Sequence, residues 1–200
     1  MSEKSIAILG KGPSVSRCTK EFIDSFDEVA ACGRPVFSGY DHVIGSRAKY
    51  DFANRTASPY TQEEKSRLGI EHTIDTGSNT AIRENFSYKN LDPSSGILVF
   101  DYFLKQDEYT EIALIGFDLF QTMEKMYYFK NEEFDPALEW LWNDGTYDTE
   151  GRLTIVSGHK TEETFDYLND MFDLHSNKKF HIISSYPFKE KDNVVIFNKE

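Results

Sequence analysis

The sequence has 200 residues and a formal net charge of -12 at pH 7, with 39% hydrophobic and 14% aromatic residues. This composition fits one globular domain that buries a core, and it excludes a disordered chain. An acidic chain is a poor general partner for nucleic acid or an anionic membrane, although a small basic cluster could still bind one phosphate. Cys18 and Cys32 are too few for a disulfide scaffold or a cysteine zinc site, so we expect buried thiols in a reducing compartment.

No apolar run approaches the length of a membrane span, and the polar start, Met1 to Lys4, lacks a signal-peptide pattern. The chain also contains no internal repeat and no low-complexity tract. We therefore expect a soluble, cytoplasmic protein.

The first predicted element is a strand over Ile6–Leu9 that runs directly into a glycine loop, Gly10-Lys-Gly-Pro-Ser14. The continuous apolar run suits an interior strand covered on both faces. The two glycines allow a tight turn, and Ser14 or Ser16 is placed to cap the helix that follows. Such a loop either presents backbone N–H groups to a phosphate or is a tight turn without a ligand. Its spacing is neither GxGxxG nor GxxxxGK[ST], so it indicates neither a dinucleotide site nor a P-loop.

Predicted strands and helices alternate along the rest of the chain, which indicates an α/β fold with a mostly parallel, doubly wound sheet. We expect further strands over 28–32, 48–53, 70–75, 111–116, 179–184 and 194–197. Helices are expected over 18–25, 61–68, 97–104 and 161–172, whereas 37–47 and 76–92 are predicted as turns and loops. The helix over 161–172 is amphipathic, with Phe165, Leu168 and Phe172 on its apolar face.

Polar residues follow several strands at the edge where an open parallel sheet binds its ligands. Asn54 follows the third strand, and Gly116-Phe117-Asp118 ends the fifth. Ser94-Ser95-Gly96 opens the helix over 97–104, where the serines could act as caps or hold an anion. Asn54 could contact a ligand or satisfy its own backbone in a turn.

Residues 121–151 differ from the rest of the chain in being rich in aromatic and acidic side chains, and part of the segment, 136–142, is predicted to be helical. An insertion of this size is typical of a lid over a site, and the alternative is a second core cluster. The acidic surroundings argue against a stacking platform for single-stranded bases. The rings and the methionine are Met126, Tyr127, Tyr128, Phe129, Phe134, Trp140, Trp142 and Tyr147.

His159 differs from the other histidines because Ser157-Gly158 precedes it and a predicted helix begins directly after it. A neutral imidazole at this position can accept a proton from a hydroxyl, since its unperturbed pKa is about 6.5. The alternative is a helix cap. The other histidines, His42, His72, His175 and His181, have no metal-ligand spacing, and no suitable loop carries a DxD pair, so no metal is expected.

Four segments, in this order, resemble the motifs of the bacterial sialyltransferases of glycosyltransferase family 42. That family carries a GxGPS loop, a TSG segment, a SGIDF-like strand end and an IGHS histidine, and the family 29 sialyltransferases share the layout. The resemblance covers residues 5 to 170. Its segments here are Gly10-Lys-Gly-Pro-Ser14, Ser94-Ser-Gly96, Leu114-Ile-Gly-Phe-Asp118 and Ser157-Gly-His159-Lys.

The resemblance implies a single domain over 1–200 with a Rossmann-like, variant GT-A fold and a lid over 121–151. It also implies inverting, metal-independent transfer from a CMP-linked, sialic-acid-like donor to an acceptor hydroxyl, with no cofactor besides the nucleotide sugar. His159 would be the general base that deprotonates the acceptor.

The resemblance also assigns the donor site. The nucleotide loop would consist of Gly10, Gly12, Pro13 and Ser14, and the donor would further contact Asn54, Ser94, Ser95, Gly96, Gly116 and Asp118. Tyr127 matches one of two tyrosines that stabilise the leaving phosphate as it gains negative charge. Phe120 stands where the other is expected, so that Tyr128 would have to supply it.

Two further departures concern the donor: Gly33 replaces an asparagine expected near the nucleotide, and Asp92 replaces a basic residue. A sugar other than sialic acid therefore stays open. A second hypothesis is a phage-type transferase that adds a pentose or similar sugar to a modified nucleobase of DNA, aided by a basic patch. A third is a degenerate, non-catalytic nucleotide-binding module, and a homo-oligomer is compatible with each. The basic patch consists of Arg34, Arg47, Lys49 and Arg55.

Overall fold

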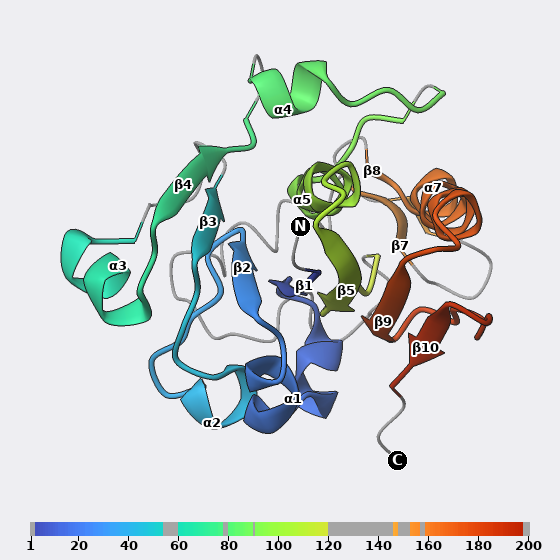
Figure 1. The fold of residues 1–200 in the computed structure, drawn as a ribbon. Helices are drawn as coiled ribbons and strands as arrows, with labels where there is room; N and C mark the ends of the chain where they lie inside the picture. Colours follow the sequence, from blue (N-terminus) through green and yellow to red (C-terminus); the bar gives the residue numbers. More distant parts are fainter. Residues whose placement is uncertain are drawn as a thin grey trace.

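The computed structural model describes residues 3–53, 60–77, 80–89, 91–119, 146–147, 153–156 and 159–197. In this part of the chain, seven parallel strands form one sheet in the order β10-β9-β5-β1-β2-β3-β4 (Figure 1). The predicted parallel α/β sheet is therefore confirmed. Its strands are β1 (Lys4–Leu9), β2 (Glu28–Cys32), β3 (Tyr50–Ala53), β4 (His72–Asp75), β5 (Tyr109–Ile115), β9 (Lys179–Ile183) and β10 (Val194–Ile196).

The central strand β1 is buried on both faces because its apolar run, Ile6 to Leu9, contacts a core on either side. It pairs with β2 on one side and β5 on the other. The chain builds outward through β2, β3 and β4, then returns to β5 and builds in the opposite direction. The point between β1 and β5 is thus the switch point of the sheet, where open α/β folds bind ligands beyond the carboxyl ends of the strands.

Helices cover both faces of the sheet, as expected for a doubly wound fold. One core lies beneath α5 (Ser95–Leu104) and α7 (Thr161–Leu174) and includes Ile8, Phe52, Phe100, Leu114, Phe172 and Phe180. The other includes Leu9, Val15, Ile23, Val29, Ile44 and Ile115. It lies beneath the 3-10 helix η1 (Pro13–Arg17), α1 (Lys20–Asp24), α2 (Asp41–Ile44) and the end of α3 (Gln62–Leu68). Figure 1 shows α5 and α7 on the side of the sheet opposite α1 and α2.

The serine caps predicted after the first loop are wrong. The helix that follows is η1, and Gly12 occupies its cap position without a side-chain hydrogen bond. Ser14 Oγ instead donates to the Ile183 carbonyl at 3.0 Å, and Ser16 Oγ to the Pro13 carbonyl at 2.9 Å. The helix predicted over 18–25 begins only at Lys20, because the Thr19 hydroxyl accepts from the Phe22 N–H and so caps it there.

Two short helices and a small sheet were not predicted. Helix α2 lies in the segment expected to be turns, and α4 (Ala81–Glu84) lies in the one expected to be loop. An antiparallel sheet joins β6 (Thr146–Tyr147), β7 (Leu153–Val156) and β8 (His159–Lys160). Elements of two to four residues are too short to show a hydrophobic period. Apart from Thr146 and Tyr147, the predicted lid and its helix lie outside the described residues.

No helix in the described ranges combines the length and apolarity that crossing a bilayer requires. Both cysteines are buried thiols, as predicted.

A buried carboxyl group lies within the sheet. Asp51 of β3 is 0% exposed, and among the described residues neither of its oxygens has a hydrogen-bond partner. Because alternate residues of a strand face opposite sides, Asp51 faces away from Tyr50 and Phe52, which belong to the core beneath α5. Burial raises the pKa of Asp51, and the positive charges of Lys65 and Arg34 offset only part of that effect.

We expect Asp51→Asn to stabilise the protein by about 1–3 kcal/mol at pH 7.5, because an unpaired buried carboxylate is costly. The folded pKa lies above the unfolded one, so the stability that the protonated carboxyl contributes is lost as the pH rises through the folded pKa. The gain should therefore shrink as the pH falls towards 4. Thermal melts of both proteins between pH 4 and 8 measure it. Asp192→Asn, at an exposed turn, is the control. A gain at Asp51 that does not change with pH would contradict this account.

Candidate functional site

The loop after β1 is held against the end of β5 by its own backbone. The Gly10 N–H donates to the Ile115 carbonyl at 2.7 Å, and the Gly12 N–H to the Gly116 carbonyl at 3.0 Å. The Ser14 N–H donates to Asp118 Oδ2 at 2.8 Å. These three amides bond within the protein, so a phosphate at this loop would require other donors.

Two glycines make this close approach possible. A Cβ atom on Gly12 would lie 2.3 Å from Asp118 Oδ2 and 2.6 Å from the Gly116 carbonyl oxygen. Gly116 has a φ of +73°, and a Cβ atom there would lie 2.6 Å from Val15 Cγ2. Any side chain at either position would force the loop and the strand end apart.

Asp118 joins three segments at the carboxyl edge of the sheet. Its side chain is buried, and one oxygen accepts from the Ser14 N–H while the other accepts from the Ser185 N–H at 2.5 Å. Ser184 Oγ also donates to the Phe117 carbonyl at 2.6 Å. Asp118 therefore clamps the ends of β1, β5 and β9, and its contact with a cytidine stays a prediction.

The serine turn before α5 is structural in part. Ser94 Oγ accepts from the Ile97 N–H and caps the helix, which is one of the two predicted roles. Thr76 Oγ1, beyond the end of β4, donates to Ser95 Oγ at 3.0 Å. A Cβ atom on Gly96 would lie 3.0 Å from the Phe117 ring, so the start of α5 packs against the segment that contains Asp118.

His159 is brought to the same edge by the helix that follows it. Its backbone lies in β8, and Thr161 Oγ1, at the start of α7, donates to the Leu119 carbonyl at 3.0 Å. Hydrogen bonds and packing contacts thus join the segments of the first three motifs at the end of β5, and Thr161, which follows the fourth motif, contacts the same edge. The structure describes the backbone of His159 but not its side chain. Four further predicted residues lie outside the described ranges: Asn54, Phe120, Tyr127 and Tyr128.

Lys11 is a polar residue of this edge that the sequence analysis did not single out. A Cβ atom on Gly33, just beyond β2, would lie 3.3 Å from Lys11 Cε and 3.5 Å from its Nζ. Burial lowers the pKa of Lys11 to about 8, and burial raises the pKa of the neighbouring Cys32 thiol to about 12. The sequence feature that could have identified Lys11 is its place between two glycines at the end of the central strand.

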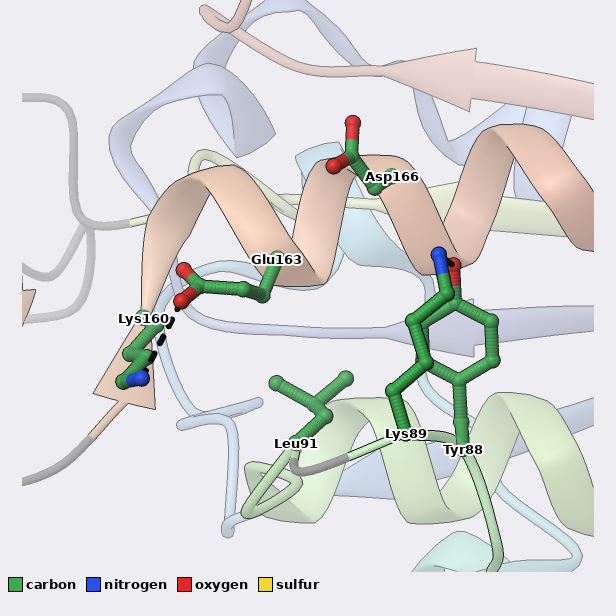
Figure 2. A pocket seen from close by; sticks show the side chains of 6 residues that line it. All are labelled: Tyr88, Lys89, Leu91, Lys160, Glu163 and Asp166. Atoms are coloured by element: carbon green, nitrogen blue, oxygen red, sulfur yellow. Dashed lines mark hydrogen bonds and ion pairs between the residues drawn. The ribbon is translucent and has the colours of Figure 1, made fainter.

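A groove of about 200 Å³ opens beside Lys160, the residue after His159. Figure 2 shows Leu91 between the Lys160–Glu163 pair and the Tyr88–Lys89 pair. Lys160 Nζ lies 3.1 Å from Glu163 Oε1, and Lys89 Nζ donates to the Tyr88 hydroxyl at 2.7 Å. The lining, which is completed by Asp166, offers hydrogen-bond donors, acceptors and an aromatic ring.

The predicted basic patch is largely engaged within the protein. Arg34 lies 3.5 Å from Glu64, and Lys49 Nζ donates to Glu28 Oε1 at 2.6 Å. Arg47 donates to backbone carbonyls, including that of Asp27 at 3.0 Å. Arg55 lies outside the described residues. The patch therefore offers little free positive charge for a DNA acceptor. Among the described residues, no three His, Cys, Asp or Glu side chains are grouped as metal ligands would be.

The sequence matches no protein-family model and none of the curated proteins. The fold matches solved structures. The sialyltransferase CstII from Campylobacter jejuni in complex with CMP aligns with a TM-score of 0.59 and 16% identity, over 94% of this chain and 83% of CstII. A second structure of the CMP complex gives a TM-score of 0.58, with 18% identity over 90% of this chain and 81% of that one. The CstII complex with CMP-3FNeuAc gives a TM-score of 0.53, with 17% identity over 90% of this chain and 81% of that one. The chain therefore has the sialyltransferase fold that its motifs predicted.

Proposed function

We propose that the protein is a nucleotide-sugar glycosyltransferase that transfers a sugar from a CMP-linked, sialic-acid-like donor to an acceptor hydroxyl. The observation that carries the proposal is that three motif segments, distant in the sequence, lie together at the switch point of the sheet, and that Thr161, directly after the fourth, contacts the same edge. The fold, shared with a sialyltransferase whose structures contain CMP, supports the same donor class. The motifs resemble those of enzymes that invert the anomeric centre without a metal ion, and we propose the same chemistry here.

In this reaction His159 accepts the proton of the acceptor hydroxyl while the hydroxyl oxygen attacks the anomeric carbon. The bond between that carbon and the phosphate oxygen breaks, and the nucleoside monophosphate leaves with both bonding electrons. A single displacement of this kind inverts the anomeric centre. Tyr127 and Tyr128 would donate hydrogen bonds to the leaving phosphate, whose negative charge grows in the transition state.

The groove next to Lys160 is the proposed acceptor side. It lies beside the residue after His159, so an acceptor bound there would hold its hydroxyl near the base. Three of its charged side chains are paired: Lys160 lies 3.1 Å from Glu163, and Lys89 lies 3.4 Å from Asp170, which also accepts from the Tyr88 hydroxyl. Paired charges and a tyrosine ring suit an uncharged, polyhydroxyl acceptor such as a glycan.

Thermal melts with CMP, CDP, UMP, UDP and GDP, with and without magnesium, test the donor. A ligand at about 100 times its dissociation constant adds about 2.7 kcal/mol of stability. We expect stabilisation of this size by CMP and no dependence on magnesium. A preference for UDP or GDP would retain the transferase and replace the donor. No response to any nucleotide would contradict the proposed function.

A further inference from the structure

We propose that the groove beside Lys160 selects acceptors by charge, so that it admits a neutral sugar and excludes an acceptor that carries a carboxylate or a phosphate. The residues that we assign to this selection are Glu163 and Asp166 of α7. The inference rests on the proposed function, in which this groove is the acceptor side, and adds the residues that decide which acceptors are used. They act by repelling the wrong acceptor, which is a common source of specificity.

One wall of the groove is held in place by the core. The Tyr88 hydroxyl donates to Asp170 Oδ2 at 2.5 Å, and the Tyr88 ring packs edge-to-face on Tyr167 with the ring centroids 4.9 Å apart. Tyr167 is buried, and its hydroxyl donates to Asp101 Oδ1 at 2.9 Å. Leu91, which is 8% exposed, supplies an apolar surface beside this wall (Figure 2). A sugar ring that packs its apolar face here therefore meets a fixed surface.

The groove is small. Its volume is about 200 Å³, below the range of about 300–1,000 Å³ for pockets that hold drug-sized ligands. We expect it to hold one sugar ring, so that the remainder of a longer acceptor extends past the rim. Charges at the rim therefore act on the part of the acceptor that lies next to the bound ring.

Both lysines of the groove are paired with carboxylates. Lys160 Nζ lies 3.1 Å from Glu163 Oε1. Lys89 Nζ lies 3.4 Å from Asp170 Oδ2 and donates to the Tyr88 hydroxyl at 2.7 Å. Neither ammonium is therefore left uncompensated to attract an anionic acceptor.

Asp166 adds a negative charge that is not balanced. It is exposed on α7, three residues after Glu163 and four before Asp170, a spacing that places all three carboxylates along one side of the helix. In the described part of the chain, no side chain forms a hydrogen bond or an ion pair with Asp166. Figure 2 shows its carboxylate pointing away from Leu91, which places it at the rim. Two lysines against three carboxylates leave one net negative charge around the groove.

This charge disfavours an anionic acceptor more than a neutral one. An anion is repelled at the rim and finds no uncompensated ammonium inside, whereas the hydroxyls of a neutral sugar can donate to the carboxylates. The same repulsion applies to the phosphates of a DNA acceptor. Because exposed charges have small effects that salt screens, we expect a preference of a few-fold that weakens as the ionic strength rises.

The test uses acceptors that differ in one group. Methyl galactoside is paired with methyl galacturonoside, and methyl glucoside with methyl glucuronoside, in which a carboxylate replaces the hydroxymethyl group. We expect the wild type to have the higher kcat/KM for the neutral member of a pair. Asp166→Asn should reduce that preference about 2- to 5-fold, the usual effect of one exposed charge. Glu163→Gln, which leaves Lys160 unpaired, should reduce it by a similar factor.

The preference is a ratio of two kcat/KM values from one preparation, so a variant that is partly unfolded does not change it. Glu162→Gln is the matched control, because Glu162 is also an exposed carboxylate in the first turn of α7 but does not line the groove. Its preference should equal that of the wild type. Sodium chloride at about 0.5 M should reduce the preference of the wild type, since it screens exposed charges.

An unchanged preference in both Asp166→Asn and Glu163→Gln would overturn the proposal, as would an equal change in Glu162→Gln. A wild type that uses neutral and anionic glycosides equally would also overturn it, as would faster transfer to an oligonucleotide with hydroxymethylated bases. A wild type that CMP stabilises, but that transfers sugar to neither neutral glycoside, overturns the charge selection and not the donor assignment. A wild type that binds no nucleotide overturns the proposed function and the charge selection together.

Discussion

His159→Ala should lower the rate of sugar transfer about 10²- to 10⁴-fold, the range that a general base contributes to catalysis. Without the imidazole, the acceptor hydroxyl must attack while it still carries its proton. CMP should bind this variant as tightly as the wild type, because the nucleotide loop is built from β1 and β5 and not from β8. Turnover and nucleotide-induced thermal stabilisation, measured on the same preparation, separate the two effects.

The matched control is His42→Ala, because His42 is exposed on α2, which lies on the other face of the sheet from α7. Its turnover should equal that of the wild type. Loss of turnover in His159→Ala with nucleotide binding intact would exclude the non-catalytic module. A wild type that binds CMP but never transfers a sugar to any glycan acceptor would instead favour that module, as would His159→Ala with unchanged turnover.

Gly116→Ala should strongly destabilise the strand end against which the first loop packs. The new Cβ atom would lie 2.6 Å from Val15 Cγ2, in a backbone whose φ is +73°. Overpacking and the left-handed conformation together cost about 2–5 kcal/mol. For a chain of this length the melting temperature should fall by roughly 10 °C.

Gly39→Ala is a close control for that experiment. Gly39 also has a positive φ, +80°, but no atom lies within 4 Å of the position of its Cβ. It therefore bears the conformational cost without the clash, and the difference between the two variants measures the packing of the loop against β5. If Gly116→Ala and Gly39→Ala lower the melting temperature equally, the loop shifts to accommodate the new methyl group without further cost. CMP affinity should fall in Gly116→Ala and stay unchanged in Gly39→Ala.

Much of the fold was predictable because its strands are short apolar runs bounded by turn residues. β2 spans Glu28–Cys32, the predicted range, since Gly33-Arg34-Pro35 ends it. The amphipathic pattern of α7 also placed Leu168 and Phe172 in the core as predicted. Helix α2 has four residues and β8 has two, and such elements depend on tertiary contacts that leave no period in the sequence.

The site was predictable as a set of segments but not as a set of contacts. The order of the motifs indicated which loops belong together. Ser14 was expected to cap a helix, yet its hydroxyl donates to Ile183, 169 residues later, and its amide to Asp118. Lys11 was visible in the sequence, but its side chain lies beside Gly33 because β1 and β2 are neighbours in the sheet. Side-chain contacts over such separations follow from the folded topology and not from local pattern.

The hydrogen bonds that hold the first loop also set the order in which parts of the protein can fold. Residues 10 to 14 leave the ribosome before the groups that shape them, which belong to residues 115–118 and 183–185. Strand β1 likewise cannot pair with β5, its partner across the switch point, until β5 has been synthesised. Contacts between such distant residues form slowly and late. The nascent chain therefore carries this loop unformed until β5 and β9 have been synthesised, and the proposed nucleotide site forms only after β9 has joined the sheet.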